Sequence, residues 1–402
     1  MKKVKLGDVC KIQSGGTPSR GNLNYWNNGN IPWVKISDIK EKYLSRTEEF
    51  ITQEGLANSS AKIFPKETIL YTIFATLGEV SILGIEATTN QAIAGLQIID
   101  ENICKDYLYY YLISLKPFVN EIGRGVAQNN INMQILRNFE IPLPSLEEQK
   151  AIARKLDKVS GLIEKRKTQH AKLSELVKSR FIEMFGTLSS HEQNFEILTI
   201  EALCSLIKDG THQTPTYTED TINGFKFLSS KDVMTEKIDW SDIKYIPSDL
   251  HERLYAVVKP IRNDILMSKN GVNYGVAAVN DTDEVFDIYV SLALLRPKTD
   301  IINPVYFRCA INNPDTKRQF DGSIKGIGVP NLHLGEIKKT QILVPPMDKQ
   351  IEYVSFVEQI DKSKYIEKIL VRVLAIFGKK YIFGNRMNTF FLKDQGLLYE
   401  SL

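Results

Sequence analysis

The spacing of apolar residues predicts one long helix over residues 145–186. Apolar side chains recur there in alternating steps of four and three, at Ile152, Leu156, Val159 and Ile163. This spacing is typical of a coiled-coil seam with charged residues on the other faces. No proline interrupts the segment, and at 1.5 Å per residue it would be roughly 60 Å long. A stripe of that length needs a second helix to cover it.

The start of this helix also has a clear signal. Pro142 and Pro144 disfavour helix immediately upstream. Ser145 followed three residues later by Glu148 has the spacing of a capping box, in which each side chain bonds to the backbone of the other residue. Farther along, the polar residues Arg166 and His170 interrupt the seam, and we interpret them as setting helix register rather than binding a ligand.

The second half of the chain repeats the order of the first. Residues 346–384 again follow a pair of prolines and predict a second long helix, in which Gln350 matches Gln149 at a shift of 201 residues. Earlier segments match at shifts that grow from 194: residues 6–10 with 200–204, 33–39 with 227–233, and 67–72 with 263–268. Two halves with matching elements indicate an ancient duplication, and a period this long excludes a solenoid repeat.

The remainder of each half predicts short strands and turns. In the first half the predicted strands are residues 31–39, 68–74, 79–85, 92–99 and 135–141, with one helix at 106–115 and loops at 14–30 and 123–132. The expected fold class is therefore α+β. It comprises two β-rich domains in tandem, each followed by a long helix, with the two helices packing as an antiparallel coiled coil in a pseudo-twofold repeat. The expected divisions are 1–144, 145–186, 187–196 (a linker), 197–345, 346–384 and 385–402 (a tail).

Composition narrows the class of protein without naming a function. The chain has 402 residues, 43% hydrophobic and 25% charged, which is ordinary for a globular protein. No apolar run is long enough for a membrane span, and the start lacks the apolar core of a signal peptide. The four cysteines are far apart in the sequence, so we expect buried thiols in the reducing cytoplasm. A net charge of +3 allows a nucleic-acid partner only where basic residues cluster.

Motifs of a self-contained enzyme are missing. The chain has no phosphate-binding loop with its lysine, no G-x-G-x-x-G, no H-E-x-x-H and no G-x-S-x-G. The Gly15-Gly16-Thr17-Pro18 segment is best interpreted as a turn. We therefore expect no catalytic residue, no cofactor site and no metal site.

Polar loops are the candidates for DNA contact. Arginine can pair with guanine edges, asparagine and glutamine with adenine edges, and lysine with phosphates. The candidates in the first half are Lys35, Ser37, Lys40, Arg124, Gln128, Asn129 and Asn130. Those in the second half are Lys231, Lys269, Asn270, Asn273, Tyr274, Ser323, Lys325, Asn331 and His333. A solvated turn would explain each of these loops without a function.

The whole layout resembles the specificity subunit of Type I restriction-modification systems. The strongest match is Ile141-Pro-Leu-Pro-Ser-Leu-Glu-Glu-Gln-Lys150, supported by Lys5-Leu-Gly-Asp-Val9, the Gly16-Thr-Pro-Ser19 turn and the Tyr-rich helix from Asp106. The second copy departs from the pattern, since Val344-Pro-Pro-Met-Asp-Lys-Gln350 has Met-Asp-Lys where Leu-Glu-Glu is usual.

The resemblance implies a non-catalytic subunit that reads double-stranded DNA. Each target-recognition domain would read half of a split, asymmetric sequence, and the helices would act as a spacer. Two methyltransferase subunits that modify adenine N6 and two motor-nuclease subunits would be the partners, and AdoMet, ATP and Mg²⁺ would belong to them. Two alternatives remain at this point: the recognition subunit of a related methyltransferase without a motor partner, and a stand-alone coiled-coil scaffold.

Overall fold

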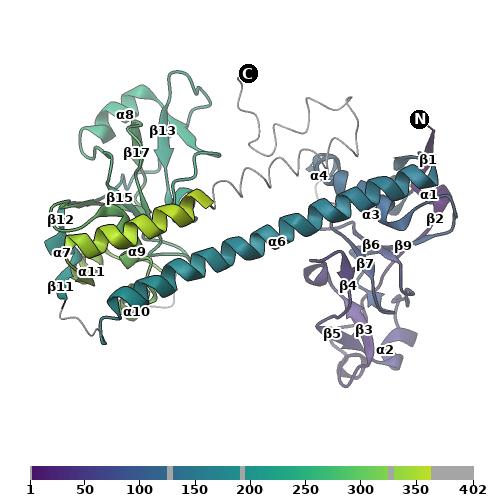
Figure 1. Ribbon diagram of the computed structural model, residues 1–402. Helices are drawn as coiled ribbons and strands as arrows, with labels where there is room; N and C mark the ends of the chain where they lie inside the picture. The colour runs from purple at the N-terminus through teal and green to yellow at the C-terminus, as the bar shows by residue number, and fades with distance from the viewer. Residues whose placement is uncertain (1, 125–129, 191–194, 325–329, 364–402) are drawn as a thin grey trace. The chain divides into compact units, whose positions relative to one another are not determined.

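The computed structural model describes residues 2–124, 130–190, 195–324 and 330–363 (Figure 1). The described residues fall into two compact units, the first ending at Lys165 and the second beginning at Arg166. Each unit is rich in short strands and contains part of a long helix, as the apolar pattern predicts. No helix in these described ranges has both the length and the apolar character that crossing a membrane requires.

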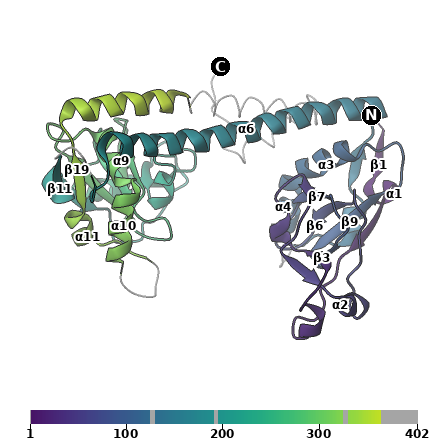
Figure 2. The ribbon, with the colours of Figure 1, turned by 60° about the horizontal axis from the view of Figure 1, so that its bottom comes forward.

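The first unit is built on a five-stranded sheet of order β2-β9-β6-β7-β4, with a three-stranded sheet β5-β3-β8 and a ribbon β1-β10. Its strands are β1 (Lys3–Lys5), β2 (Cys10–Ser14), β3 (Ile31–Val34), β4 (Tyr43–Leu44), β5 (Glu49–Ile51), β6 (Ile69–Thr72), β7 (Val80–Leu83), β8 (Thr88–Thr89), β9 (Ile93–Ile98) and β10 (Glu140–Pro142). Its helices are α1 (Leu6–Val9), η1 (Leu23–Tyr25), η2 (Ile36–Asp38), α2 (Gln53–Ala57), α3 (Lys105–Ser114), α4 (Lys116–Arg124), α5 (Met133–Arg137) and the first part of α6 (Leu146–Phe185). The three-stranded sheet and α2 lie at the end of the unit away from α6 (Figures 1 and 2).

Helix α3 connects the sheet of the first unit to α6, and Figure 2 shows it between them. Its tyrosines are buried. The Tyr110 hydroxyl donates to Asp157 of α6 at 2.7 Å. Lys42 pairs with both Asp106 of α3 and Asp157, at 2.7 and 2.5 Å. These contacts fix the first turns of α6 on the unit, and they explain why the predicted helix at 106–115 is rich in tyrosine.

The start of α6 confirms the predicted capping box. The Ser145 amide and hydroxyl both donate to the Glu148 carboxylate at 2.9 Å, and the Glu148 amide donates back to the Ser145 hydroxyl at 3.3 Å. These bonds satisfy backbone donors that a helix start leaves without partners. The helix then continues for 40 residues, to Phe185, which agrees with the predicted range to within one residue at each end.

The second unit repeats these elements around a four-stranded sheet β12-β18-β15-β16, a three-stranded sheet β14-β13-β17 and a ribbon β11-β19. Its strands are β11 (Glu196–Thr199), β12 (Cys204–Asp209), β13 (Phe225–Leu228), β14 (Lys244–Ile246), β15 (Ile265–Ser268), β16 (Ala277–Val279), β17 (Phe286–Ile288), β18 (Leu292–Pro297) and β19 (Gln341–Val344). Its helices are α7 (Ile200–Leu203), η3 (Ser230–Val233), α8 (Ser248–Tyr255), α9 (Pro304–Ile311), α10 (Pro314–Ser323) and α11 (Leu334–Lys339), with helical residues 347–363 after β19.

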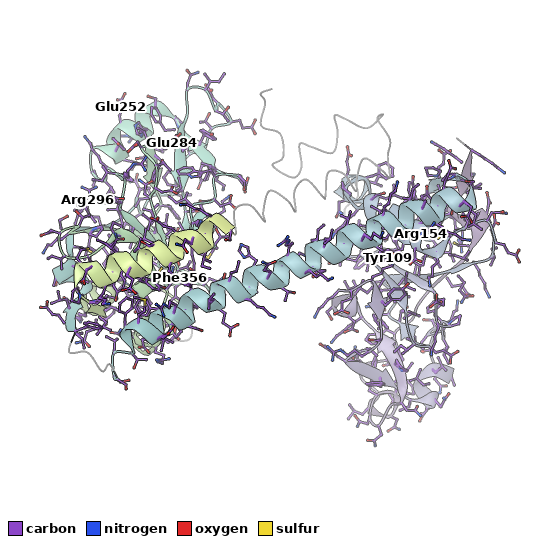
Figure 3. The ribbon with its side chains drawn as sticks, viewed as in Figure 1. Tyr109, Arg154, Glu252, Glu284, Arg296 and Phe356 are labelled. Carbon is purple, nitrogen blue, oxygen red and sulfur yellow. The ribbon has the colours of Figure 1, made fainter. Side chains whose placement is uncertain are left out.

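One ion pair stabilises the sheet of the second unit from within. Arg296 of β18, labelled in Figure 3, donates to Asp264 at 2.8 Å. The Asp264 side chain is 1% exposed, and its second oxygen also accepts from Arg296 and from the Ile261 amide. Removal of one partner from a buried pair is costly because it leaves the other charge unpaired. We therefore assign Arg296 and Asp264 to the fold rather than to a functional site.

The two long helices contact each other within the second unit. Tyr353 is fully buried, and its hydroxyl donates to the Val177 carbonyl of α6 at 3.0 Å. Its ring meets Phe181 and Phe185 of α6 edge-on, with ring centroids 5.5 Å apart in both pairs. The predicted contact between the long helices is confirmed here. Residues 364–384 of the predicted second helix and the tail 385–402 lie outside the described residues.

Two buried glutamines join each long helix to its unit in the same way. Gln149 accepts from the Cys104 amide and donates to the carbonyls of Asn102 and Pro144, at 2.8 to 3.0 Å. Gln350 accepts from the Asn303 amide and donates to the carbonyls of Ile301 and Pro345, at 2.8 to 3.1 Å. Both glutamines are fully buried. The two glutamines, which match in the sequence at a shift of 201 residues, therefore also make equivalent hydrogen bonds in the structure.

The substitution Gln149→Ala is expected to destabilise the first unit strongly. It leaves an amide and two carbonyls without partners, and each buried group in that state costs roughly 1–3 kcal/mol. We expect the free energy of unfolding to fall by about 3 kcal/mol or more in chemical denaturation. The exposed Lys158 on the same helix provides the control. The substitution Lys158→Ala should change the free energy of unfolding by no more than about 0.5 kcal/mol. Equal denaturation midpoints for the two variants would contradict this account.

Two predictions for the end of the first domain were wrong. Residues 135–141 were expected to form one strand, but they contain the end of α5, a turn and the short strand β10. The reason is a cap, because the Asn132 side chain accepts from the Ile135 amide at 2.8 Å and starts a helix there. The loop expected from residue 123 is also shorter, because α4 extends to Arg124.

Candidate nucleic-acid interface

Backbone hydrogen bonds join five separate segments at one edge of the first unit. We call this surface the first loop edge and define it as residues 15–20, 34–37, 73–74, 89–92 and 130–131. The bonds run from Gly16 N to Thr89 O, Asn90 N to Val34 O, Ile73 N to Ala92 O and Ile131 N to Ile73 O, at 2.9 to 3.0 Å. Loops far apart in the sequence are therefore held together by main-chain atoms, and the exposed side chains on these loops, such as Arg20 and Ser37, can contact a ligand.

The second unit has the same arrangement, which we call the second loop edge: residues 210–212, 228–231, 269–271, 289–291 and 331–332. The equivalent bonds run from Thr211 N to Ile288 O, Tyr289 N to Leu228 O, Lys269 N to Ser291 O and Leu332 N to Lys269 O, at 2.8 to 3.1 Å. Each bond has a counterpart in the first loop edge between matching strands and loops. The two edges therefore share a main-chain framework although their side chains differ.

A glycine begins each framework at the same place. A Cβ atom on Gly15 would lie 2.0 Å from the Thr89 hydroxyl oxygen, and one on Gly210 would lie 2.0 Å from the Ile288 carbonyl oxygen. No side chain fits at such a distance, so only glycine lets the loop approach the neighbouring strand. The Gly-Gly turn in the sequence is thus required by close packing.

The structure brings some of the first-half candidates to the first loop edge. Lys35 and Ser37 lie at the end of β3 and in η2, and Asn130 forms an isolated bridge with Phe74. Lys40 is exposed just beyond η2. Arg124 is the last residue of α4, and Gln128 and Asn129 lie outside the described residues.

Four of the second-half candidates lie on the second loop edge, namely Lys231, Lys269, Asn270 and Asn331. Lys269 is almost fully buried and pairs with Asp209 at 2.7 Å. Asn270 forms an isolated bridge with Asn331, and its side-chain oxygen is buried with no hydrogen-bond donor among the described residues.

The other second-half candidates are nearby in sequence but differ in their surroundings. Asn273 is exposed between β15 and β16, while Tyr274 donates to Asp321 at 2.5 Å. Ser323 ends α10 and bonds to the Phe320 carbonyl at 2.8 Å. His333 is exposed at the start of α11, and Lys325 lies outside the described residues.

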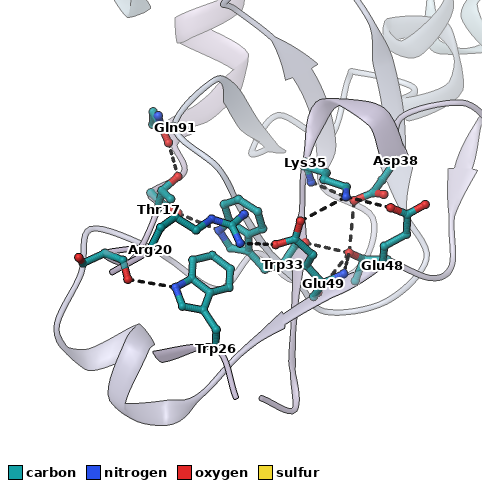
Figure 4. A network of polar contacts seen from close by, with 12 residues as sticks. Thr17, Arg20, Trp26, Trp33, Lys35, Asp38, Glu48, Glu49 and Gln91 are labelled. Carbon is teal, nitrogen blue, oxygen red and sulfur yellow. Dashed lines mark hydrogen bonds and ion pairs between the residues drawn. The ribbon is translucent and has the colours of Figure 1, made fainter. Parts of the chain in front are cut away.

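Sequence reasoning missed one group of side chains on the first loop edge. Arg20 lies against Trp26 and Trp33, and Thr17 contacts Gln91 beside it (Figure 4). The only signal in the sequence was the glycine turn just before Arg20, which indicates a loop but not the residues that it brings together.

Each described lysine or arginine discussed on the two edges has a carboxylate partner. Arg20 pairs with Glu49 at 2.6 Å, and Lys35 with Glu48 at 2.8 Å and Glu49 at 3.2 Å. Lys231 pairs with Asp242 at 2.6 Å. Hydrogen bonds to Glu48 and Glu49 raise the pKa of Lys35. Burial lowers the pKa of Lys231, but Asp242 and Asp232 outweigh burial and raise the pKa overall. Lys35 and Lys231 are therefore charged, and in the free chain their charge is locally balanced.

The arrangement can bind polar edges and phosphates, whereas nothing described forms a metal centre. Within residues 2–124, 130–190, 195–324 and 330–363, no three His, Cys, Asp or Glu side chains are grouped as metal ligands. Amides, hydroxyls, lysines and an arginine on loops are the groups that proteins use to contact bases and phosphates.

A comparison with models of known protein families identifies the family to which this chain belongs. A family model described as "Type I restriction modification DNA specificity domain" matches residues 1–174 and 220–375, which is most of the chain. The chain belongs to this family. It is a specificity subunit of a Type I restriction-modification system, and its role is recognition of the DNA target. The resemblance drawn from the sequence motifs is confirmed.

The chain is similar in sequence to other specificity subunits. The MjaIX specificity subunit of Methanocaldococcus jannaschii is 27% identical over 96% of this chain and 92% of the relative. The EcoR124I/EcoR124II specificity subunit of Escherichia coli is 31% identical over a shorter region, which covers 39% of this chain and 40% of the relative.

Solved structures agree on the fold of the specificity subunit. The S subunit from M. genitalium has 15% identity and a TM-score of 0.50, over 100% of this chain and 96% of that one. A chain from a structure of the type I R-M system, described for complex assembly and conformational transition, has 16% identity and a TM-score of 0.55, over 95% and 96%. These similarities support an α+β fold with two β-rich regions and long helices.

Proposed function

We propose that this specificity subunit reads a bipartite, asymmetric DNA sequence, with one half-site for each β-rich unit. The target-recognition domains would be residues 1–144 and 197–345, joined by the linker 187–196. The first loop edge would contact one half-site and the second loop edge the other. Direct contacts would be made in the grooves by the candidate residues of each edge, while lysines near the edges would position the phosphates.

The observation that carries this proposal is the shared framework of the two loop edges. Four equivalent main-chain hydrogen bonds hold each edge, yet exposed side chains at equivalent places differ, since Ser37 matches Lys231. Two binding surfaces of one shape and different chemistry fit two targets of different sequence. This difference would make the complete DNA target asymmetric.

The long helices would separate the two half-sites. We propose that residues 145–186 and 346–384 pack antiparallel as a coiled coil, and that the two halves are related by a pseudo-twofold axis. The contact of Tyr353 with Val177 and Phe181 supports the pairing of the helices. A rigid pair of this kind would fix the number of unread base pairs between the half-sites.

The catalytic steps would belong to partner subunits. Two methyltransferase subunits would methylate adenine N6 at the two half-sites, and two motor-nuclease subunits would cut unmodified DNA. The relatives are named as specificity subunits of Type I restriction enzymes, which supports such an assembly. Its location would be the cytoplasm, where the DNA is found and where the four unpaired cysteines fit a reducing environment.

The purified chain alone is expected to transfer no methyl groups and to cut no DNA. Addition of its cognate methyltransferase subunit should produce adenine methylation at one defined bipartite sequence. The measurement is incorporation of labelled methyl groups from AdoMet, followed by single-molecule sequencing of the product. The methyltransferase without this chain is the control and should show no sequence preference. Methyl transfer by the chain alone would contradict the proposed function.

A further inference from the structure

Arg20 is held in a fixed plane on the first loop edge. Its guanidinium carbon lies 3.7 Å from the ring centroid of Trp26 and 4.7 Å from that of Trp33. The two indoles meet edge-on, with ring centroids 5.0 Å apart (Figure 4). A guanidinium over an aromatic face is attracted by the ring and loses freedom to rotate. The donors of Arg20 therefore point in defined directions although the side chain is 53% exposed.

The same two indoles also fix the loop that carries Arg20. The Trp26 ring nitrogen donates to the Ser19 carbonyl at 3.1 Å, and the Trp33 ring nitrogen donates to the Gly16 carbonyl at 3.0 Å. Trp33 is 3% exposed and belongs to the strand β3. The loop before η1 is thus tied to the three-stranded sheet, and Arg20 is positioned by its surroundings before any ligand is bound.

In the free chain, Glu49 forms an ion pair with Arg20. One Glu49 oxygen lies 2.6 Å from Arg20, while the other lies 3.2 Å from the Lys35 ammonium. Burial raises the pKa of the Glu49 carboxyl, but the hydrogen bonds from Arg20 and Lys35 outweigh burial and lower the pKa overall. Glu49 is therefore ionised at neutral pH. A carboxylate presents two acceptor oxygens to a guanidinium, as the O6 and N7 atoms of guanine do.

We propose that Arg20 is a specificity-determining residue of the first unit. Its guanidinium donates to the major-groove edge of a guanine in the first half-site, and this base edge replaces Glu49 as its acceptor. The inference rests on the proposed function and names a residue and a base for it. It also assigns a role to Glu49, which keeps Arg20 in place and balances its charge until a matching base is present.

Two features favour a base edge over a phosphate. A phosphate can be contacted from many directions, so stacking that fixes the guanidinium plane would add little, whereas a bidentate base contact requires such a plane. On the side of Arg20 away from Glu49, the nearby side chains of Thr17 and Gln91 are uncharged and contact each other. Hydroxyl and amide groups of this kind commonly contact base edges.

The test uses the full chain in complex with its methyltransferase and a pool of DNA duplexes randomised across the first half-site. The variant Arg20→Lys keeps the charge but lacks the planar fork of donors. We expect preference for guanine at one position to fall about tenfold to a hundredfold, with the other positions unchanged. A phosphate contact would instead weaken all sequences alike. A purely structural Arg20 would lower the unfolding temperature and leave every preference intact. Either result would overturn the inference.

Glu49→Gln provides a second variant that leaves Arg20 in the chain. Without the carboxylate, binding to unrelated DNA should strengthen several-fold and weaken more steeply with added salt, while guanine is still preferred. The matched control is Glu48→Gln, because Glu48 pairs with Lys35 and has no contact with Arg20 among the described ion pairs. Equal binding of unrelated DNA by the two glutamate variants would overturn the role of Glu49.

The outcomes separate this inference from the proposed function. If the unaltered complex methylates no defined sequence, the proposed function itself fails. If it methylates a bipartite sequence and Arg20→Lys changes no position, only the inference about Arg20 fails. A first half-site without guanine would overturn the inference in the same way.

Discussion

Exchange of residues 1–144 for the equivalent part of another specificity subunit is expected to change one half of the methylated DNA sequence and to leave the other half unchanged. The exchange keeps β1 and β10 together, so the ribbon that they form is not divided. The exchange keeps Gln149 but replaces the residues that it contacts. These contacts should still form, because all three partners are backbone atoms, which any sequence supplies. The new module should therefore keep the Gln149 attachment to α6, and a relative with Lys and Tyr at the places of Lys42 and Tyr110 would also keep the contacts with Asp157.

The size of this effect should be large, because every base contact of one half-site would be replaced at once. Each mismatched base pair costs roughly 1–3 kcal/mol, so methylation of the original half-site should fall to the background level. The measurement is single-molecule sequencing of methylated adenines in cells that express the chimera with its methyltransferase. The reciprocal exchange of residues 197–345 is the control and should change the other half only. A change in both halves would show that the two units do not read DNA independently.

Insertion of four residues after Gln169 is expected to lengthen the unread spacer between the half-sites by one or two base pairs. The insertion lies within α6, which continues without a break from Leu146 to Phe185, and extends the helix by roughly 6 Å. Four extra residues are a stutter that a coiled coil absorbs by local unwinding. DNA rises about 3.4 Å per base pair, so the change in helix length matches that shift in spacing.

Both half-sites should stay the same in this variant, since neither loop edge is altered. Sequencing of methylated DNA would report the spacer directly. A control insertion of four residues after Ile222, an exposed turn residue of the second unit, should leave the spacer at its original length. A methylome with the original spacer at full efficiency after the helix insertion would show that the helices do not set the distance.

The long helix was predictable because its signals reinforce one another over many residues. The seam spacing, the absence of proline and the Ser145–Glu148 box all indicate the same helix, and the structure places its ends within one residue of the expected ones. The segment 135–141 had only a few apolar residues, which cannot distinguish a short strand from a helical turn. There the Asn132 cap decided the local structure.

The candidate site was only partly predictable. Loops rich in Gly and Asn could be identified from the sequence, and Lys35, Lys231 and Lys269 do lie on the loop edges. Arg20 could not be chosen among the arginines, because its role depends on stacking against Trp26 and Trp33, which are brought to it by the fold. The pairing of each cation with a carboxylate could not be predicted from the sequence either, because partners such as Asp209 and Lys269 are 60 residues apart.

The framework of the loop edges has a consequence for how restriction systems diversify. Main-chain groups make the equivalent hydrogen bonds that join the segments of each edge, and the side chains of those residues take no part in these bonds. Substitution of exposed residues on the edges, such as Ser37 and Lys231, can therefore alter the chemistry of the surface without removing these main-chain contacts. A lineage under attack by phage that carry the protective methyl mark can acquire a new target sequence through a few codons, while the fold is inherited unchanged.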